Sequence, residues 1–102
     1  MDRVATLRRF ISEKPEDPFP RYALALELKG QGSPADAAAE LEALVAKKPD
    51  YLAAYLMLGL IQQTLGRNGD AKATLQAGQA MARTQGNSHT LGELTSALET
   101  LG

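Results

Sequence analysis

One sequence pattern occurs twice between Arg21 and Arg83, with a spacing of thirty-four residues. The repeated positions hold identical residues in both copies. They are the pairs Leu24 and Leu58, Leu26 and Leu60, Gly32 and Gly66, Asp36 and Asp70, Ala37 and Ala71, Ala39 and Ala73, Leu41 and Leu75, Ala43 and Ala77, and Ala46 and Ala80. Self-similarity at a fixed period of this size is typical of stacked repeats, in which one unit cannot bury its apolar face alone. We therefore expect a stack of small units.

The composition favours closely packed helices. Apolar residues make up 44% of the 102 residues, whereas aromatic residues make up 5%. The core must therefore consist mainly of leucine and alanine, which have high helix propensity. A chain of this length is expected to form one domain and to bury about 65% of the surface of its unfolded state. We expect an all-α, right-handed solenoid of antiparallel helix pairs over residues 1–102.

The charge balance does not indicate a nucleic-acid or membrane partner. Eleven basic and twelve acidic residues give a formal net charge of −1, and neither sign is concentrated in one part of the chain. The absence of cysteine excludes disulfides and thiol chemistry. The first residues lack the apolar run of a signal peptide, and no stretch approaches about 18 apolar residues. A cytoplasmic location is therefore expected.

Helical periodicity, proline and glycine divide the chain into four parts. We expect an N-terminal helix in residues 1–15, a first repeat in 16–49, a second repeat in 50–85 and a capping helix in 86–102. The capping helix carries a single apolar stripe, which suits the end of a stack because the other side faces water. This stripe consists of Leu91, Leu94, Leu98 and Leu101.

The N-terminal helix has the pattern of the second helix of a repeat. Pro15 lies thirty-four residues before Pro49, and three apolar residues precede apolar residues of the first repeat by the same distance. These pairs are Leu7 and Leu41, Phe10 and Leu44, and Ile11 and Val45. We therefore expect this helix to be a half-repeat.

The turns carry typical helix-ending and helix-starting residues. Gly32 and Gly66 are expected to adopt the left-handed conformation that ends a helix at low steric cost. Side chains that can accept hydrogen bonds from the first turn are expected to cap the helix N-termini. These are Asp2, Asp17, Ser33 and Asn68, with Asn87 and Ser88 before the last helix.

Two helices per thirty-four residues, with this order of large, small and turn residues, resemble the tetratricopeptide repeat. In the second copy Tyr55, Leu58 and Gly59 occupy the W-x-x-L-G positions of that family, followed by Gly66 at the turn and Ala71 in the second helix. The first copy has Arg21, Leu24, Ala25, Gly32, Ala37, Leu41 and Pro49 at the corresponding positions. The pattern departs from the family at Arg21, Leu44, Gly78 and Arg83.

The small residues of this pattern predict close helix contacts. We expect Ala25 to lie against Ala37, and Gly59 against Ala71, so that the two helices of each repeat approach without intervening side chains.

The sequence offers no convincing catalytic or metal-binding constellation. His89 is the only histidine, and Asp36 with Glu40 is more simply read as a solvated acidic face near a helix N-terminus. Arg8 and Arg9 are too few for a nucleic-acid surface. We therefore expect no enzyme activity, no cofactor and no metal.

The resemblance implies that the first helix of each repeat lines a concave face that binds a peptide or helix of a partner protein. The residues that it places there are Phe19, Tyr22, Ala23, Leu26, Lys29, Ala53, Leu56, Met57, Leu60 and Gln63. Family members that clamp the C-terminal carboxylate of heat-shock chaperones place Lys and Asn on this face, so that ligand is not expected. An apolar groove suits an amphipathic helix or an extended apolar segment. The alternative is a homodimer or another structural assembly that uses the same face.

Overall fold

The computed structural model describes residues 2–101 and consists of six α-helices in that range. They are α1 (Arg3–Glu13), α2 (Pro18–Gly30), α3 (Pro34–Lys47), α4 (Leu52–Thr64), α5 (Asn68–Gln85) and α6 (Ser88–Leu101). No strand occurs among the described residues, in agreement with the expected all-α solenoid.

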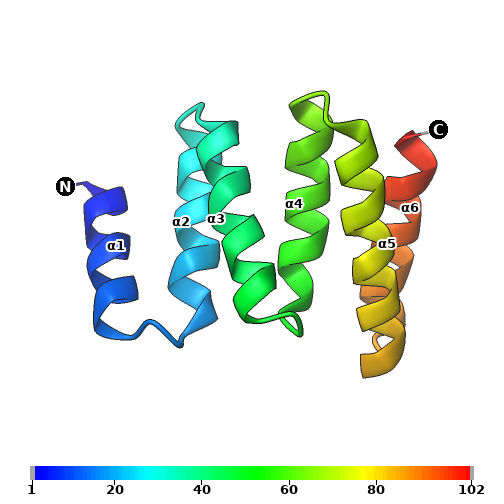
Figure 1. Cartoon of the computed structure of the whole chain (residues 1–102), viewed down its shortest axis with the longest axis horizontal. Helices are drawn as coiled ribbons and strands as arrows, with labels where there is room; N and C mark the ends of the chain where they lie inside the picture. Colours follow the sequence, from blue (N-terminus) through cyan, green and yellow to red (C-terminus); the bar gives the residue numbers. More distant parts are fainter. Residues whose placement is uncertain (1, 102) are drawn as a thin grey trace.

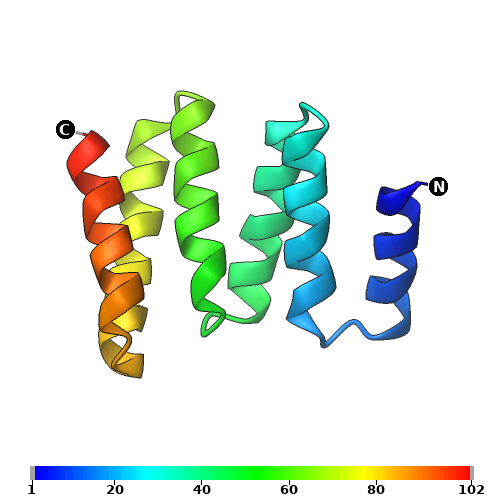
Figure 2. The ribbon, with the colours of Figure 1, turned by 180° about the vertical axis from the view of Figure 1, so that it is seen from behind.

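The helices form a two-layered stack of antiparallel pairs. Each helix packs against the next one in the sequence, and α4 also contacts α6. Helices α3 and α5 lie on the face seen in Figure 1, and α2, α4 and α6 line the opposite face in Figure 2. The molecule measures 39 × 28 × 19 Å, so it is elongated along the direction of stacking. The first helices of the two repeats, α2 and α4, thus share one face with the last helix.

Two apolar clusters hold the stack together. The first joins α2, α3 and α4 around fully buried Leu24, Leu41 and Leu44, and α1 covers its edge. The second joins α4, α5 and α6 around Leu75 and Leu94. The expected stripe of α6 belongs to this second cluster, with Leu94 fully buried and the other three leucines packed at its margin.

The helix ends follow most of the expected signals. The side chains of Asp2 and Asp17 accept hydrogen bonds from the first turns of α1 and α2, and Asn87 accepts one from the Thr90 N–H in α6. Ser33 occupies the N-cap position of α3 but makes no side-chain hydrogen bond to the helix. Ser88 is already the first residue of α6.

The prediction of Asn68 as N-cap of α5 is wrong. Asn68 is the first helical residue, and Arg67 is the N-cap. The Arg67 N–H donates to the Gln62 carbonyl at 2.8 Å, which completes the turn through Gly66 and leaves no room for a further loop residue. The Arg67 guanidinium instead links Glu42 and Asp70, and these hydrogen bonds raise its pKa above the ordinary value.

Gly32 and Gly66 have φ angles of 81° and 78°, which confirms the left-handed turns. Gly32→Ala and Gly66→Ala should each lower the free energy of unfolding by about 1–2 kcal/mol, since an L-residue is strained in this conformation. No other atom lies within 4 Å of the added methyl group, so the loss reports the backbone alone. Urea denaturation measures it. Gly30→Ala is the control, because its surroundings are equally open and its φ is not positive. Equal stabilities for all three variants would contradict this account.

The small residues of the pattern lie in close-packed positions. Ala25 and Ala37 are both fully buried, and the three atoms nearest to a Cβ atom on Gly59 all belong to Leu75. A Cβ atom on Gly59 would lie 2.6 Å from the Leu75 Cγ atom. The absence of a side chain at Gly59 therefore serves to admit a leucine of α5.

Candidate functional site

The ten residues predicted to line the concave face all lie outside the fully buried core. Five are exposed, namely Phe19, Leu26, Lys29, Ala53 and Leu60, and five are partly buried, namely Tyr22, Ala23, Leu56, Met57 and Gln63. Their helices, α2 and α4, both line the face shown in Figure 2.

A hollow of about 410 Å³ lies on this face, between α2, α4 and the beginning of α6. We call it the groove. It brings together half of the predicted residues, together with four that were not predicted to line this face. Its lining consists of Tyr22, Leu52, Ala53, Leu56, Met57, Leu60, Asn87, Thr90 and Glu93. The other five predicted residues, Phe19, Ala23, Leu26, Lys29 and Gln63, do not line it. Phe19 lies in a separate hollow with Phe10 at the turn between α1 and α2.

The floor of the groove is apolar because α4 is apolar on nearly every side. One side of α4 packs into the core through Leu58 and Ile61, which are at most 2% exposed. Leu56, Met57 and Leu60 fall on the other sides, so they remain after the core is complete. Methionine adapts its shape readily to an apolar ligand.

Two leucines at equivalent positions stand out on the surface of this face. Leu26 in α2 is 38% exposed and Leu60 in α4 is 37% exposed. Leu24 and Leu58, two residues earlier in the same helices, are buried. Each helix therefore places one leucine in the core and a second leucine, two residues later, in contact with water. Single exposed apolar residues are common on proteins, but a pair repeated at equivalent positions, of which Leu60 lines an apolar hollow, indicates a binding surface.

The wall formed by α6 is polar and was missed. Thr90 and Glu93 of α6, and Asn87 just before its first residue, are spaced three residues apart, so they fall on one side. Asn87 was expected only as a cap, and Thr90 and Glu93 were given no role. The polar row beside the leucine stripe can be seen in the sequence. It indicates a wall of the groove only once the contact between α6 and α4 is known.

Tyr22, which lines the groove, packs against Tyr51. The ring centroids of Tyr22 and Tyr51 lie 5.6 Å apart, with the planes tilted by 57°. Burial raises the pKa of Tyr22, and burial with the nearby charges of Tyr22 and Asp17 raises the pKa of Tyr51. Both phenols are therefore neutral at physiological pH. Tyr22 contributes an aromatic ring and a hydroxyl group to the groove.

The described residues contain no group of three or more His, Cys, Asp or Glu side chains that could hold a metal ion. His89 points into solvent with 87% of its side chain exposed, and its nearest charged partner is Glu93 at 3.7 Å. Within residues 2–101, no helix is long and apolar enough to cross a membrane.

Comparison with known proteins agrees with this geometry. The tetratricopeptide repeat family model matches residues 28–92. A crystal structure of a tetratricopeptide repeat domain protein from Salinibacter ruber is 39% identical, covers 83% of this chain and 94% of that chain, and superposes with a TM-score of 0.78. A search of the curated proteins gives no match.

More distant structures share the fold. The TPR2B domain of yeast Sti1, in a complex with pHsp70, is 21% identical, covers 96% of this chain and 78% of that chain, and has a TM-score of 0.89. Protein BPP2914 from Bordetella parapertussis is 22% identical, covers 99% of this chain and 88% of that chain, and has a TM-score of 0.83. The fold of these proteins is a protein–protein interaction module. With more than half of its length matched by the family model and a relative at 39% identity, this chain belongs to the tetratricopeptide repeat family.

Proposed function

We propose that this protein is a scaffold that binds a short apolar segment of a partner protein in the groove. The observation that carries this proposal is the apolar floor of the groove, which includes exposed Leu60, together with the exposure of Leu26 at the equivalent position of α2. Burial of these side chains by a ligand releases apolar surface from water, at about 25 cal/mol per Å². An amphipathic helix or an extended segment with apolar side chains supplies the complementary surface.

The polar wall adds a preference for a basic residue in the ligand. Of the described residues, those that line the groove include one carboxylate, Glu93, and no lysine or arginine. Asn87 and Thr90 beside it offer further oxygen acceptors. A lysine or arginine next to the apolar residues of the ligand would pair with Glu93, whereas a ligand carboxylate would be repelled.

The test uses peptides selected from a random displayed library on the unmodified protein, with affinities measured by fluorescence anisotropy. Selected peptides should be rich in Leu, Ile, Phe or Met and contain Lys or Arg. Leu26→Glu combined with Leu60→Glu should weaken their binding by about 100-fold or more, since each unpaired carboxylate buried against an apolar ligand costs about 1.4 kcal/mol or more. Circular dichroism should remain helical, because both positions are exposed in the free protein.

Ala43→Glu combined with Ala77→Glu is the matched control. These residues also lie thirty-four positions apart and are exposed, but on α3 and α5, which form the opposite face. Binding should be unchanged in this variant. Selection of predominantly acidic peptides, or equal loss of binding in both double variants, would overturn the proposal. If sedimentation shows a dimer that only the Leu26 and Leu60 variant dissociates, the groove is occupied by a second copy instead.

A further inference from the structure

Among the described helices, only α2 packs closely against α1, so the outer side of α1 is uncovered. The corresponding helix α3 packs against two helices. Leu41 and Leu44 of α3 are fully buried, because α3 packs between α2 and α4. The residues thirty-four positions earlier are Leu7, which is partly buried, and Phe10, which is 43% exposed. No residue of α1 is buried. A shallow hollow on this side is lined by Arg3, Thr6, Leu7 and Phe10.

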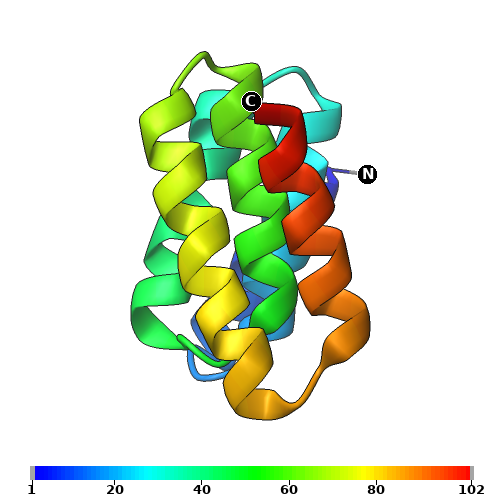
Figure 3. The same cartoon turned by 90° about the vertical axis from the view of Figure 1, so that its right-hand side faces the viewer.

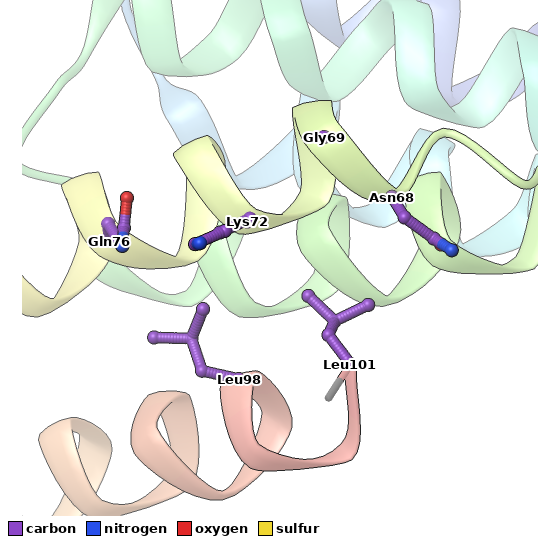
Figure 4. A pocket seen from close by; sticks show the side chains of 6 residues that line it. All are labelled: Asn68, Gly69, Lys72, Gln76, Leu98 and Leu101. Carbon is purple, nitrogen blue, oxygen red and sulfur yellow. The ribbon is translucent and has the colours of Figure 1, made fainter.

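The opposite end of the stack carries a cleft between α5 and α6. It has a volume of about 430 Å³, and Leu98 and Leu101 point from α6 toward α5 across it (Figure 4). The cleft is lined by Asn68, Gly69, Lys72, Gln76, Leu98 and Leu101. Viewed from this end, α5 and α6 lie in front and α4 lies between and behind them (Figure 3).

The position of Leu98 shows which element this cleft suits. Gln62 and Leu98 stand ten residues after the first residues of α4 and α6. Gln62 is 3% exposed because α5 covers it, and its amide oxygen accepts a hydrogen bond from Thr74 of α5 at 2.7 Å. Leu98 is only partly buried, because no described helix packs over it as α5 packs over Gln62. The cleft therefore has the shape that the second helix of a repeat fills.

Helix α1 has the sequence pattern of such a second helix, and its charge complements that of α6. The segment Arg3–Glu13 contains three arginines and one glutamate, a net charge of +2, whereas Ser88–Leu101 contains two glutamates and no lysine or arginine, a net charge of −2. Arg3 and Arg8 already pair with Glu27 and Glu40, so Arg9 is the arginine of α1 that supplies charge to a second copy. The Arg9 guanidinium lies 5.6 Å from the centroid of the Phe10 ring, next to the uncovered side. Glu99, beside Leu98, has no ion-pair partner within residues 2–101.

We infer that a second copy of this chain docks head to tail, with α1 of one copy in the cleft between α5 and α6 of the next. In this contact α1 of one copy would pack against α6 of the other, as α3 packs against α2. The stack of helix pairs would thus continue from one copy into the next. The two contacting surfaces are different, so a pair of copies still has one unoccupied α1 and one unoccupied cleft. Further copies can bind there, and the assembly grows as an open row. The groove is not part of this contact.

The first measurement is the average mass by sedimentation equilibrium of the 102-residue chain. The mass should rise between about 10 µM and about 1 mM protein, as expected for a small interface. It should fall toward that of one chain at about 0.5 M NaCl, where charges are screened beyond about 4 Å. Phe10→Glu and Leu98→Glu should each give a monomer at all concentrations. Leu26→Glu, in the concave face, should leave the rise in mass unchanged, which separates this inference from the proposed function.

Mixing the two end variants gives the decisive result. A chain with Phe10→Glu keeps an intact cleft, and a chain with Leu98→Glu keeps an intact α1. Their mixture should form a 1:1 complex with twice the mass of one chain and no larger species. A contact between identical surfaces cannot give this result, since both variants would be defective in the same interface.

Charge exchange supplies a second pair of variants in case Leu98→Glu fails to fold. Arg9→Glu and Glu99→Arg both change exposed side chains, so the fold should be kept. Each alone should weaken association several-fold at low salt, and a mixture of the two should restore it. A wild-type chain that remains monomeric at about 1 mM, or mixtures that remain monomeric in both pairs, would overturn the inference.

Discussion

Gly78→Val should lower the free energy of unfolding by about 3 kcal/mol or more, one of the largest effects expected of a single substitution in this chain. Gly78 lies in the middle of α5, where α5 touches both α4 and α6. A Cβ atom at this position would stand 2.7 Å from the Cβ atom of Tyr55 and 3.0 Å from a methyl carbon of Leu94. The Tyr55 Cβ atom is fixed to the backbone of α4, so the two helices would have to separate.

The matched control for this prediction is Gly69→Ala in the first turn of the same helix. No atom lies within 4 Å of a Cβ atom on Gly69, so this variant should be neutral or more stable by about 0.5–1 kcal/mol. Gly78→Ala should fall between the two, since the steric cost is partly offset by higher helix propensity. Thermal melts followed at 222 nm give the order of stabilities. A Gly78→Val protein as stable as the unmodified one would show that α4 and α5 are not in this close contact.

Tyr55 is itself held in place by a hydrogen bond. Its hydroxyl group donates to the Pro49 carbonyl oxygen at 2.6 Å, in the turn before α4. Its ring packs in the second cluster. Displacement of Tyr55 by a larger residue at position 78 would therefore disturb both the turn and the cluster, which is why the expected loss exceeds that of an ordinary surface change.

The fold could be predicted because the thirty-four-residue period constrains it at every position. Each repeated leucine in the core, such as Leu24 with Leu58 or Leu41 with Leu75, is at most 2% exposed in the structure. Two independent copies of one pattern must satisfy the same packing, so a feature that is present in both copies reports the fold rather than a chance match. The turn glycines were predictable for the same reason.

The thirty-four-residue period indicates the N-cap of α5 correctly, whereas the local residue preference does not. Ser33 is the N-cap of α3, and thirty-four residues later stands Arg67, the observed N-cap of α5. Asparagine has a strong preference for N-cap positions, which favoured Asn68. The length of the turn is fixed by Gly66 and by the hydrogen bond from Arg67 to Gln62, so propensity at the next residue had no influence.

The partner of Gly59 and the α6 wall of the groove could not be predicted because they depend on how helices pack against each other. A small residue in a repeat pattern indicates a close contact, but not whether a backbone or a side chain such as Leu75 fills the space. Glu93 enters the groove only because α6 also packs against α4. Phe19 was predicted to line the groove, but it lies at the turn between α1 and α2.

Removal of residues 87–102 should abolish most of the stability of the α4–α5 half of the molecule. Leu94 is fully buried and Ala97 is 8% exposed, and both pack in the second cluster against Leu52 and Leu75. Without α6 this apolar surface would face water, and a repeat stack loses stability when its capping helix is absent. The truncated chain should aggregate or melt at a much lower temperature, since natural domains have only about 5–15 kcal/mol of total stability.

Leu94→Ala is the graded form of the same test and keeps the chain length unchanged. Its expected cost is about 2–5 kcal/mol, because a fully buried leucine is replaced by a cavity. Ser96→Ala, an exposed change in the same helix, should alter the free energy of unfolding by less than about 0.5 kcal/mol. Urea denaturation followed by circular dichroism measures all three proteins. If the truncated chain remains monomeric with an unchanged melting temperature, or if Leu94→Ala is as stable as Ser96→Ala, then α6 does not cap the stack and the apolar surface of α5 is stable in water without it.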